Sequence, residues 1–267
     1  MTDFRKYTPD DEYKRREHQQ GVESSKDVIK EYEKQNSKIN LKFKIVIIIA
    51  IVSILGSFVY FSNVANSSEF NTKFVIENLQ GEPIDTWRVW KLTDDDLLHI
   101  HVVESQYATP VRLDAIKDVM MSTDSNDGRF AGWGGALDTI STDTVFSIPN
   151  NLHFDVTSDG VGHVLINLEN YSDSDGFDGF TTAIVDEKNN QILKASITIY
   201  NVNSLTTDEL QTIIRHELGH AFGLGHSDDE DDLMHFKIIT TNPLISECNV
   251  KSIENLYDDK HDLDFLC

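Results

Sequence analysis

Cysteine and basic residues are both scarce in this chain of 267 residues. The two cysteines are Cys248 and Cys267. They allow one disulfide if they lie outside a membrane, and two free thiols are the alternative. Lysine and arginine number 23 against 45 aspartates and glutamates, so the formal net charge is −22. A chain this acidic repels polyanions, which excludes nucleic acid as a partner.

One long stretch lacks charge altogether. Residues 45–61 read IVIIIAIVSILGSFVYF, and the uncharged run continues through Ala65. Because about 20 residues of helix cross a bilayer, residues 43–65 are predicted to form a transmembrane signal anchor, with membrane lipid as a partner. A buried core helix is the alternative, but such a helix is seldom apolar on every face. Cleavage near Ala65 stays open.

The charges on either side of this run set the predicted orientation. Three lysines lie close to its N-terminal end (Lys38, Lys42 and Lys44), whereas the first charge beyond it is Glu69. Positive charge stays on the cytoplasmic side, so residues 1–42 are predicted to be a charged cytoplasmic tail. Residues 66–96 then form a stalk and N-terminal extension, and residues 97–267 form an extracellular domain.

Strand and helix patterns alternate in the extracellular part, which predicts an α+β or α/β class. Asn189-Asn190 is a hairpin signal between two strands, and Gly132–Gly135 is expected to be a glycine-rich turn. The predicted strands cover residues 73–77, 97–104, 162–168, 181–185 and 192–200, and the predicted helices cover residues 111–121, a stretch from about 207, and 246–257.

Four histidines are scattered over this region (His99, His101, His153 and His163). A histidine on a strand is usually a partly buried residue with a hydrogen-bond partner, so none of the four is assigned to a metal. The loop of residues 172–179, SDSDGFDG, holds three aspartates (Asp173, Asp175 and Asp178). Oxygen-rich loops can bind Ca²⁺, but no EF-hand glutamate follows, and a solvated turn is the favoured alternative.

The most informative segment is residues 206–235, TTDELQTIIRHELGHAFGLGHSDDEDDLMH. It opens with a T-x-x-E capping box, and apolar residues then recur at helical spacing. His216 and His220, four residues apart, therefore lie on one face of a helix. Two neutral imidazoles so placed can hold one Zn²⁺, and the Glu217 carboxylate beside them can take a proton from water.

A third ligand follows at a short distance along the chain. Gly223 comes three residues after His220, and glycine tolerates the backbone conformation that ends a helix and turns the chain. Three residues later comes His226. Three protein ligands leave the fourth position of Zn²⁺ open, which is typical of a catalytic zinc site.

The spacing His-Glu-x-x-His-x-x-Gly-x-x-His resembles the metzincin signature. Within the metzincins it is most similar to the matrixins, the matrix metalloproteinase type. Ser227 directly follows the third histidine, and Met234 stands where that family has the methionine of its Met-turn, beneath the zinc. The resemblance covers roughly residues 97–258 and is specific over residues 206–234. It implies an α+β metzincin fold with a twisted mixed sheet, an active-site helix and a C-terminal helix.

Several positions depart from the family pattern. His235 stands where matrixins usually have tyrosine, and the second, structural zinc motif of vertebrate matrixins is not recognisable. No cysteine precedes the active site to act as a cysteine switch, so latency must work differently if it exists. The family also implies that residues 192–200 form an edge strand that pairs with an extended substrate, and that residues 236–245 form one wall of the S1′ pocket.

Together, these residues and the resemblance to the matrixins imply a zinc-dependent endopeptidase that hydrolyses polypeptides outside the cell. His216, His220 and His226 hold the metal, and Glu217 is the catalytic base. The alternative is a membrane-tethered protein that binds zinc without turnover, and the intact Glu217 argues against it. A Ca²⁺ ion is kept as a further cofactor that the sequence allows.

Overall fold

The computed structural model describes residues 30, 31, 34, 68–84, 88–92, 97–140, 143–239 and 243–258. Residues 66–267 group into one compact unit by their internal contacts. Within the described ranges, no helix combines the length and the apolar character that a bilayer crossing needs. The anchor predicted at residues 43–65 lies outside the described residues, and so does most of the tail predicted at residues 1–42.

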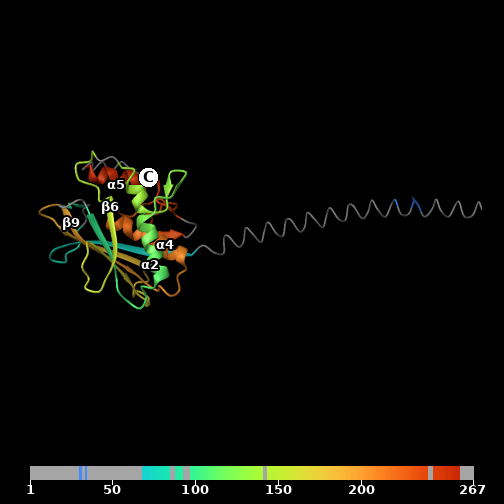
Figure 1. Cartoon of the computed structure of the whole chain (residues 1–267), viewed down its shortest axis with the longest axis horizontal. Coiled ribbons are helices and arrows are strands. Elements are labelled where there is room, and N and C mark those ends of the chain that lie inside the picture. The colour runs from blue at the N-terminus through green and yellow to red at the C-terminus, as the bar shows by residue number, and fades with distance from the viewer. Residues whose placement is uncertain are drawn as a thin grey trace, which may run out of the picture. The chain divides into compact units, whose positions relative to one another are not determined.

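The centre of the compact unit is one mixed β-sheet (Figure 1). Its strand order is β10-β1-β8-β9-β7-β3-β6, and β2 pairs with β9 off this path. The pairs β1–β8, β9–β7, β7–β3 and β3–β6 are parallel, whereas β8–β9 and β1–β10 are antiparallel. The bounds of these strands are β1 Glu69–Asn78, β2 Val89–Trp90, β3 Leu97–Val103, β6 Asn151–Thr157, β7 Val164–Leu168, β8 Gly179–Asp186, β9 Gln191–Ile199 and β10 Lys237–Ile239.

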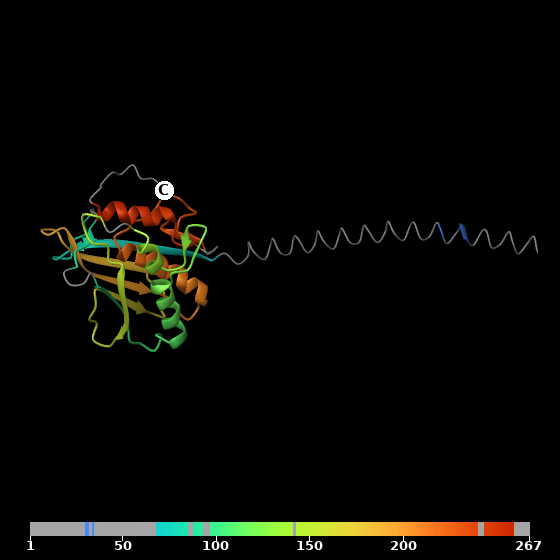
Figure 2. The same cartoon turned by 45° about the horizontal axis from the view of Figure 1, so that its top comes forward.

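Two long helices cover one face of this sheet. Helices α2 (Pro110–Met121) and α4 (Thr207–Ala221) lie side by side, as both views show (Figure 1, Figure 2). The strands turn alternate residues toward these helices, so Leu98, Ile100 and Val102 of β3 are fully buried whereas its histidines are not. Two further helices, α3 (Trp133–Leu137) and α5 (Glu247–Tyr257), and a small hairpin of β4 (Ser125–Asn126) and β5 (Arg129–Phe130) complete the unit.

Most predicted elements are confirmed, with small changes in their ends. The α+β class holds, and strands 97–104 and 162–168 correspond to β3 and β7. The hairpin of β8 and β9 turns at Asn190, whose φ is 54°. Side chains of Thr206 and Ser246 cap α4 and α5, each within a reciprocal capping box.

The prediction that residues 192–200 form an edge strand is wrong. Strand β9 lies inside the sheet, with β8 on one side and β7 on the other. The family analogy failed here because a strand's own alternating pattern states which face is buried but not which strands lie beside it.

The prediction of a glycine-rich turn at Gly132–Gly135 is also wrong, because Trp133–Leu137 form helix α3. The glycines allow this helix to lie directly against the chain that leaves α2. A Cβ at Gly135 would stand 2.8 Å from the Cα of Thr123.

Residues 66–96, expected to be a stalk and extension, contribute two strands to the main sheet. Strand β1 is longer than the predicted strand 73–77 and pairs along its whole length, first with β10 and then with β8. Figure 2 shows β1 in cyan beside the orange strands of the β8–β9 hairpin. This segment therefore belongs to the folded unit.

Candidate active site

Helix α4 carries the two histidines of the predicted metal site and the glutamate between them. His216, Glu217 and His220 are all fully buried, which is unusual for ionisable side chains. The helix begins at the Thr206 capping box, and its apolar residues hold it against the sheet (Leu210, Ile213, Ile214 and Leu218). The local sequence therefore fixes both the start of the helix and the face on which the two imidazoles lie.

The chain turns sharply after α4 and brings His226 back to the same place. Gly223 has a φ of +105°, a value that side-chain-bearing residues rarely adopt, and its amide donates to the carbonyl of His220. A Cβ at this position would stand 2.7 Å from the carbonyl oxygen of Arg88. Glycine is thus required twice here, for the backbone conformation and for the close approach of another segment.

The three imidazoles converge as the sequence predicts. Their potential ligand atoms all lie within 4.8 Å of one another, and the Nε2 atoms of His220 and His226 are 3.2 Å apart. Two nitrogens that bind one Zn²⁺ at tetrahedral angles lie roughly 3.3–3.4 Å apart, given bonds of about 2.0–2.1 Å. The geometry of this triad therefore fits a single zinc ion.

Backbone carbonyls set the tautomers of the two helical histidines. Nδ1 of His216 lies 2.6 Å from the carbonyl oxygen of Leu233, and Nδ1 of His220 lies 2.8 Å from that of Leu224. A carbonyl only accepts, so each Nδ1 carries the proton and each Nε2 keeps its lone pair. Nε2 of His216 is buried and has no hydrogen-bond partner among the described residues. A buried lone pair without a donor is costly, and a metal ion would satisfy it.

The electrostatic environment keeps these imidazoles neutral. Burial is the main cause, and it lowers the pKa of His216 to about 3 and that of His226 to about 4. Burial also places the pKa of His220 well below its usual value, and the neighbouring histidines lower it further. Neutral imidazole is the form that binds metals, so the triad needs no deprotonation at neutral pH.

Glu217 lies beside the triad in a fully buried position. Its Oε2 accepts a hydrogen bond of 2.5 Å from the Thr181 hydroxyl of β8, whereas its buried Oε1 has no partner among the described residues. Burial raises the pKa of this carboxyl to about 8, although the Thr181 hydrogen bond acts in the opposite direction. A nearby cation would favour the charged form and lower that pKa.

Gly179 makes room for this carboxylate. A Cβ there would stand 2.2 Å from Oε1 of Glu217, so any larger residue at the start of β8 would displace the acid. Neither Thr181 nor Gly179 could be found from the sequence, because the contact joins two segments 36 or more residues apart and no motif marks it.

The predicted Met-turn lies against helix α4. Met234 is buried, and its Sδ fills the space beside Gly219, where a Cβ would approach it to 2.4 Å. The amide of Met234 donates to the carboxylate of Asp232. The same carboxylate accepts both hydrogen bonds of the Asn249 amide, which ties the turn to α5.

Strand β1 crosses this site between β8 and β10. Thr72 pairs with Gly179 on β8, and its Oγ1 lies 3.2 Å from Nε2 of His226. The ring of Phe74 is stacked on His220, with centroids 4.5 Å apart and planes 8° apart. An extended segment of the chain therefore lies directly over the imidazole triad, a feature that no sequence signal indicated.

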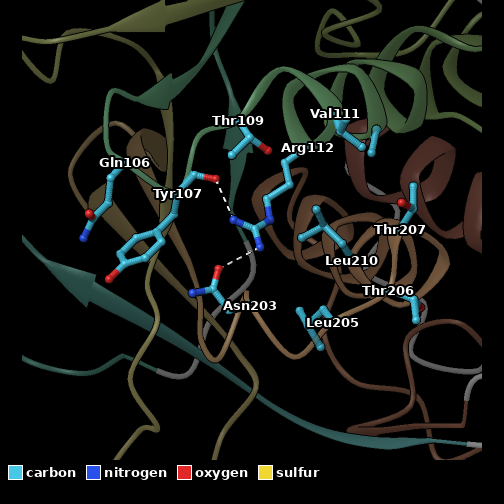
Figure 3. Close-up of a pocket in the computed structure, with 11 residues that line it drawn as sticks. Gln106, Tyr107, Thr109, Val111, Arg112, Asn203, Leu205, Thr206, Thr207 and Leu210 are labelled. Carbon is cyan, nitrogen blue, oxygen red and sulfur yellow. Dashed lines mark hydrogen bonds between the residues drawn. The ribbon is translucent and has the colours of Figure 1, made fainter.

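A separate hollow of about 510 Å³ lies between the start of α2 and the start of α4 (Figure 3). It contains none of the triad residues. The guanidinium of Arg112 points into it but is already bonded to the carbonyls of Tyr107 and Val202 and to the Asn203 side chain. These bonds connect the loop before α2 to the loop before α4. The guanidinium of Arg112 therefore has a structural role, and we assign no ligand to this hollow.

The structure bears on two further predictions, the disulfide of Cys248 and the calcium loop at residues 172–179. Cys248 is disulfide-bonded, and its pairing with Cys267 stays a prediction because Cys267 lies outside the described residues. In the loop 172–179, the Asp173 carboxylate accepts the amide of Asp175, as in a hydrogen-bonded turn, and the Asp178 carboxylate accepts the amide of Asn71 on β1. Neither aspartate belongs to a group of three or more His, Cys, Asp or Glu side chains that could hold a metal ion in the described ranges.

Comparison with known families agrees with the local geometry. Residues 144–258 match the matrixin family model. The matched segment contains the triad, Glu217 and Met234, whereas β1, β3 and α2 precede it. The C-terminal part of the chain therefore resembles a matrixin metallopeptidase domain, and the matrixin family is zinc-dependent. A search of curated proteins gives no match to the chain.

Proposed function

We propose that this protein is a zinc-dependent endopeptidase that cleaves extended polypeptides. The observation that carries the proposal is the pair of buried, unpartnered atoms at one place within the described structure, Nε2 of His216 and Oε1 of Glu217. The first is a lone pair suited to a metal ion, and the second is an acceptor suited to a proton. A site that only stored zinc would have no use for the second.

The residues of the site divide the work between metal binding and proton transfer. His216, His220 and His226 would hold Zn²⁺, which would polarise the scissile carbonyl and make water easier to deprotonate. Glu217 Oε1 then takes the proton from the attacking water and passes it to the leaving amine. The Thr181 hydroxyl holds Oε2, so the carboxylate keeps one oxygen fixed and offers the other.

Strand β1 indicates the kind of substrate and also how access is controlled. It is an extended chain that enters and leaves the site on both sides of Thr72, which supports cleavage within a polypeptide rather than at its end. While β1 occupies this groove, a substrate cannot pair with β8. We therefore infer that β1 keeps the described form closed, and that displacing it exposes the site.

We also propose where the protein acts, which is outside the cell and attached to a membrane. The uncharged run at residues 43–65 and the lysines before it support a membrane anchor with the peptidase domain outside the cell. The acidic charge of the remaining chain suits a domain that stays clear of anionic lipid.

The test uses the full chain in detergent micelles and a library of internally quenched peptides. The parent chain is compared with Val75→Pro, which disrupts the β1–β8 ladder where Val75 pairs with Thr182. Chelator and Glu217→Gln are then applied to the Val75→Pro chain. We expect cleavage to rise with Val75→Pro, to stop with chelator, and to fall at least about 100-fold with Glu217→Gln while zinc is retained.

Two outcomes would refute the proposal in different ways. Cleavage that survives complete removal of zinc would exclude the metal mechanism. A Val75→Pro chain that holds zinc but cleaves no library peptide would favour the alternative of a zinc-binding protein without turnover.

A further inference from the structure

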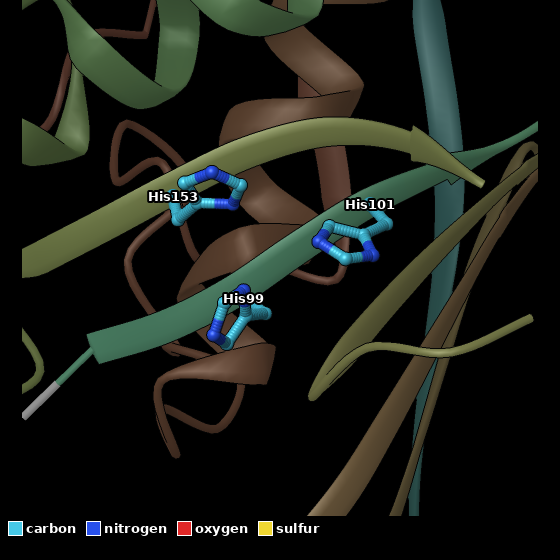
Figure 4. A group of neighbouring side chains, drawn as sticks. All are labelled: His99, His101 and His153. Carbon is cyan, nitrogen blue, oxygen red and sulfur yellow. The ribbon is translucent and has the colours of Figure 1, made fainter. Parts of the chain in front are cut away.

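Three histidines far from α4 form a second cluster on the opposite face of the sheet. His99 and His101 lie on β3, and His153 lies on β6. The intervening apolar residues of β3 are fully buried against the helices (Leu98, Ile100 and Val102). Residues of the opposite parity point away from that core, so the imidazoles stand on the outer face. Figure 4 shows the three rings together on this face.

The register of the two strands brings these rings together. His99 is directly paired with His153 across the parallel ladder, and His101 is two residues further along the same strand. Ring centroids are 5.0 Å apart for His99 and His153, 5.6 Å for His99 and His101, and 5.9 Å for His101 and His153. One potential ligand atom from each lies within 4.8 Å of the others. Within the described residues, only this cluster and the α4 triad meet that condition.

His101 has the same hydrogen bonding as the histidines of the triad. Its Nδ1 lies 2.6 Å from the carbonyl oxygen of Val161, so Nδ1 carries the proton and Nε2 keeps a lone pair. That Nε2 is buried and has no hydrogen-bond partner in the described part of the chain. His101 and His216 are the two histidines with this property there, and each belongs to one of the two clusters.

Within the second cluster, the surroundings of His99 favour its neutral, metal-binding form. Burial lowers the pKa of His99, and the proximity of His153 and His101 lowers it further. The nearby carboxylate of Asp159 interacts electrostatically with His101, and Asp155 is paired with His101 across the ladder. His163 is also close, but its Nδ1 accepts the backbone amide of His99, so its Nε2 carries the proton and does not ligate.

We propose that His99, His101 and His153 form a second transition-metal site, independent of the α4 triad. Three imidazole nitrogens suit Zn²⁺ and its neighbours in the first transition row, not Ca²⁺ or Mg²⁺. The bound ion joins β6, the last strand of the sheet in the described residues, to β3. It therefore stabilises this edge of the sheet, in addition to satisfying His101.

The alternative is that these are ordinary strand histidines. His163 fits that alternative, since its Nδ1 has a protein partner. His101 does not, because its one hydrogen bond leaves a buried lone pair directed at no donor in the described structure. The ring nitrogens of His99 and His153 also form no hydrogen bond within the described residues, so three lone pairs are available to one ion.

The experiment measures zinc stoichiometry on the full chain in detergent micelles. The protein is stripped with chelator, reloaded with Zn²⁺, desalted and analysed for metal and protein. Four variants are compared with the parent: His153→Ala, His220→Ala, the double variant, and Asn151→Ala as the matched control. Asn151 is exposed on the same strand and face as His153 but is not part of the cluster.

We expect two zinc ions per chain for the parent and for Asn151→Ala, one for each single histidine variant, and none for the double variant. Loading His220→Ala with Co²⁺ gives the visible spectrum of the second site alone, and His153→Ala must abolish that spectrum. The unfolding temperature should rise with Zn²⁺ in His220→Ala but not in the double variant.

The other possible results test two separate claims, that the second metal site exists and that it is independent of the imidazole triad. A second zinc that survives His153→Ala, with the Co²⁺ spectrum unchanged, is an adventitious ion and overturns the proposal. If His153→Ala misfolds by circular dichroism, His153→Gln replaces it, because it keeps the volume and polarity but not the imidazole. Loss of both ions in His220→Ala would overturn the independence of the two sites, whereas peptide cleavage by itself does not bear on the second site.

Discussion

The hydrogen bond from Thr181 to Glu217 gives a prediction whose size can be worked out from the structure. The donor and acceptor are 2.5 Å apart and both side chains are fully buried. A hydrogen bond to a charged group contributes about 1.5–3 kcal/mol, and about 1.36 kcal/mol corresponds to a pKa change of one. Removing the hydroxyl in Thr181→Val should therefore raise the pKa of Glu217 by about 1–2.

The sign of this effect follows from which form the hydroxyl stabilises. It donates to the carboxylate, so its loss favours the protonated acid, and protonated Glu217 cannot act as a base. Below that pKa, the fraction of active carboxylate should fall roughly 10- to 100-fold. The acidic limb of the profile of kcat/KM against pH should move to higher pH by the same amount.

The assay compares Thr181→Val with Thr181→Ser, both in the Val75→Pro chain so that the groove is open. Thr181→Ser keeps the hydroxyl and should preserve the parent profile. Zinc content should stay the same in all three proteins, since Thr181 makes no hydrogen bond to the imidazole triad in the described structure. If Thr181→Val retains the parent profile and full zinc content, the assignment of Glu217 as a base positioned by Thr181 is refuted.

Four further changes have expected outcomes. Chelation should lower the unfolding free energy on the order of 4 kcal/mol if zinc was present at about a thousand times its Kd, as calorimetry would show. Val75→Pro should raise peptide cleavage roughly five- to tenfold, since one lost strand hydrogen bond is worth about 1 kcal/mol; unchanged cleavage would contradict closure by β1. Gly223→Ala should destabilise by about 1–3 kcal/mol more than Gly81→Ala in urea, because both have positive φ but only Gly223 meets another backbone. Asn249→Ala should cost about 1–3 kcal/mol by leaving Asp232 short of donors, measured by the same urea unfolding.

Local chemistry made the metal triad predictable. The capping box, the apolar spacing and the two histidines four apart all act within one helix, whose geometry repeats regardless of the rest of the chain. Gly223 and His226 follow within six residues of His220, so the third ligand could move only a short distance from the helix end. Met234 was assigned through the family resemblance, by its separation from His226.

What lies around the triad depended on contacts between distant parts of the chain. Thr72 and His226 are 154 residues apart, and Thr181 and Glu217 are 36 apart. Strand periodicity assigned residues to a face, but neighbours in a sheet are chosen by the packing of whole strands. This is why residues 192–200 were misplaced at an edge and why β1 was not expected across the site.

The amino-acid sequence was enough to predict a helix with two histidines and a glutamate on it, a turn that brings back a third histidine, and an uncharged run long enough to span a membrane. It did not predict that an extended N-terminal strand covers that site, that a threonine holds the glutamate, or that His99, His101 and His153 meet, and these features are seen in the folded chain. The physical reason is that a helix positions side chains through bonds along the chain, whereas a sheet positions them through register between strands that the sequence does not place side by side.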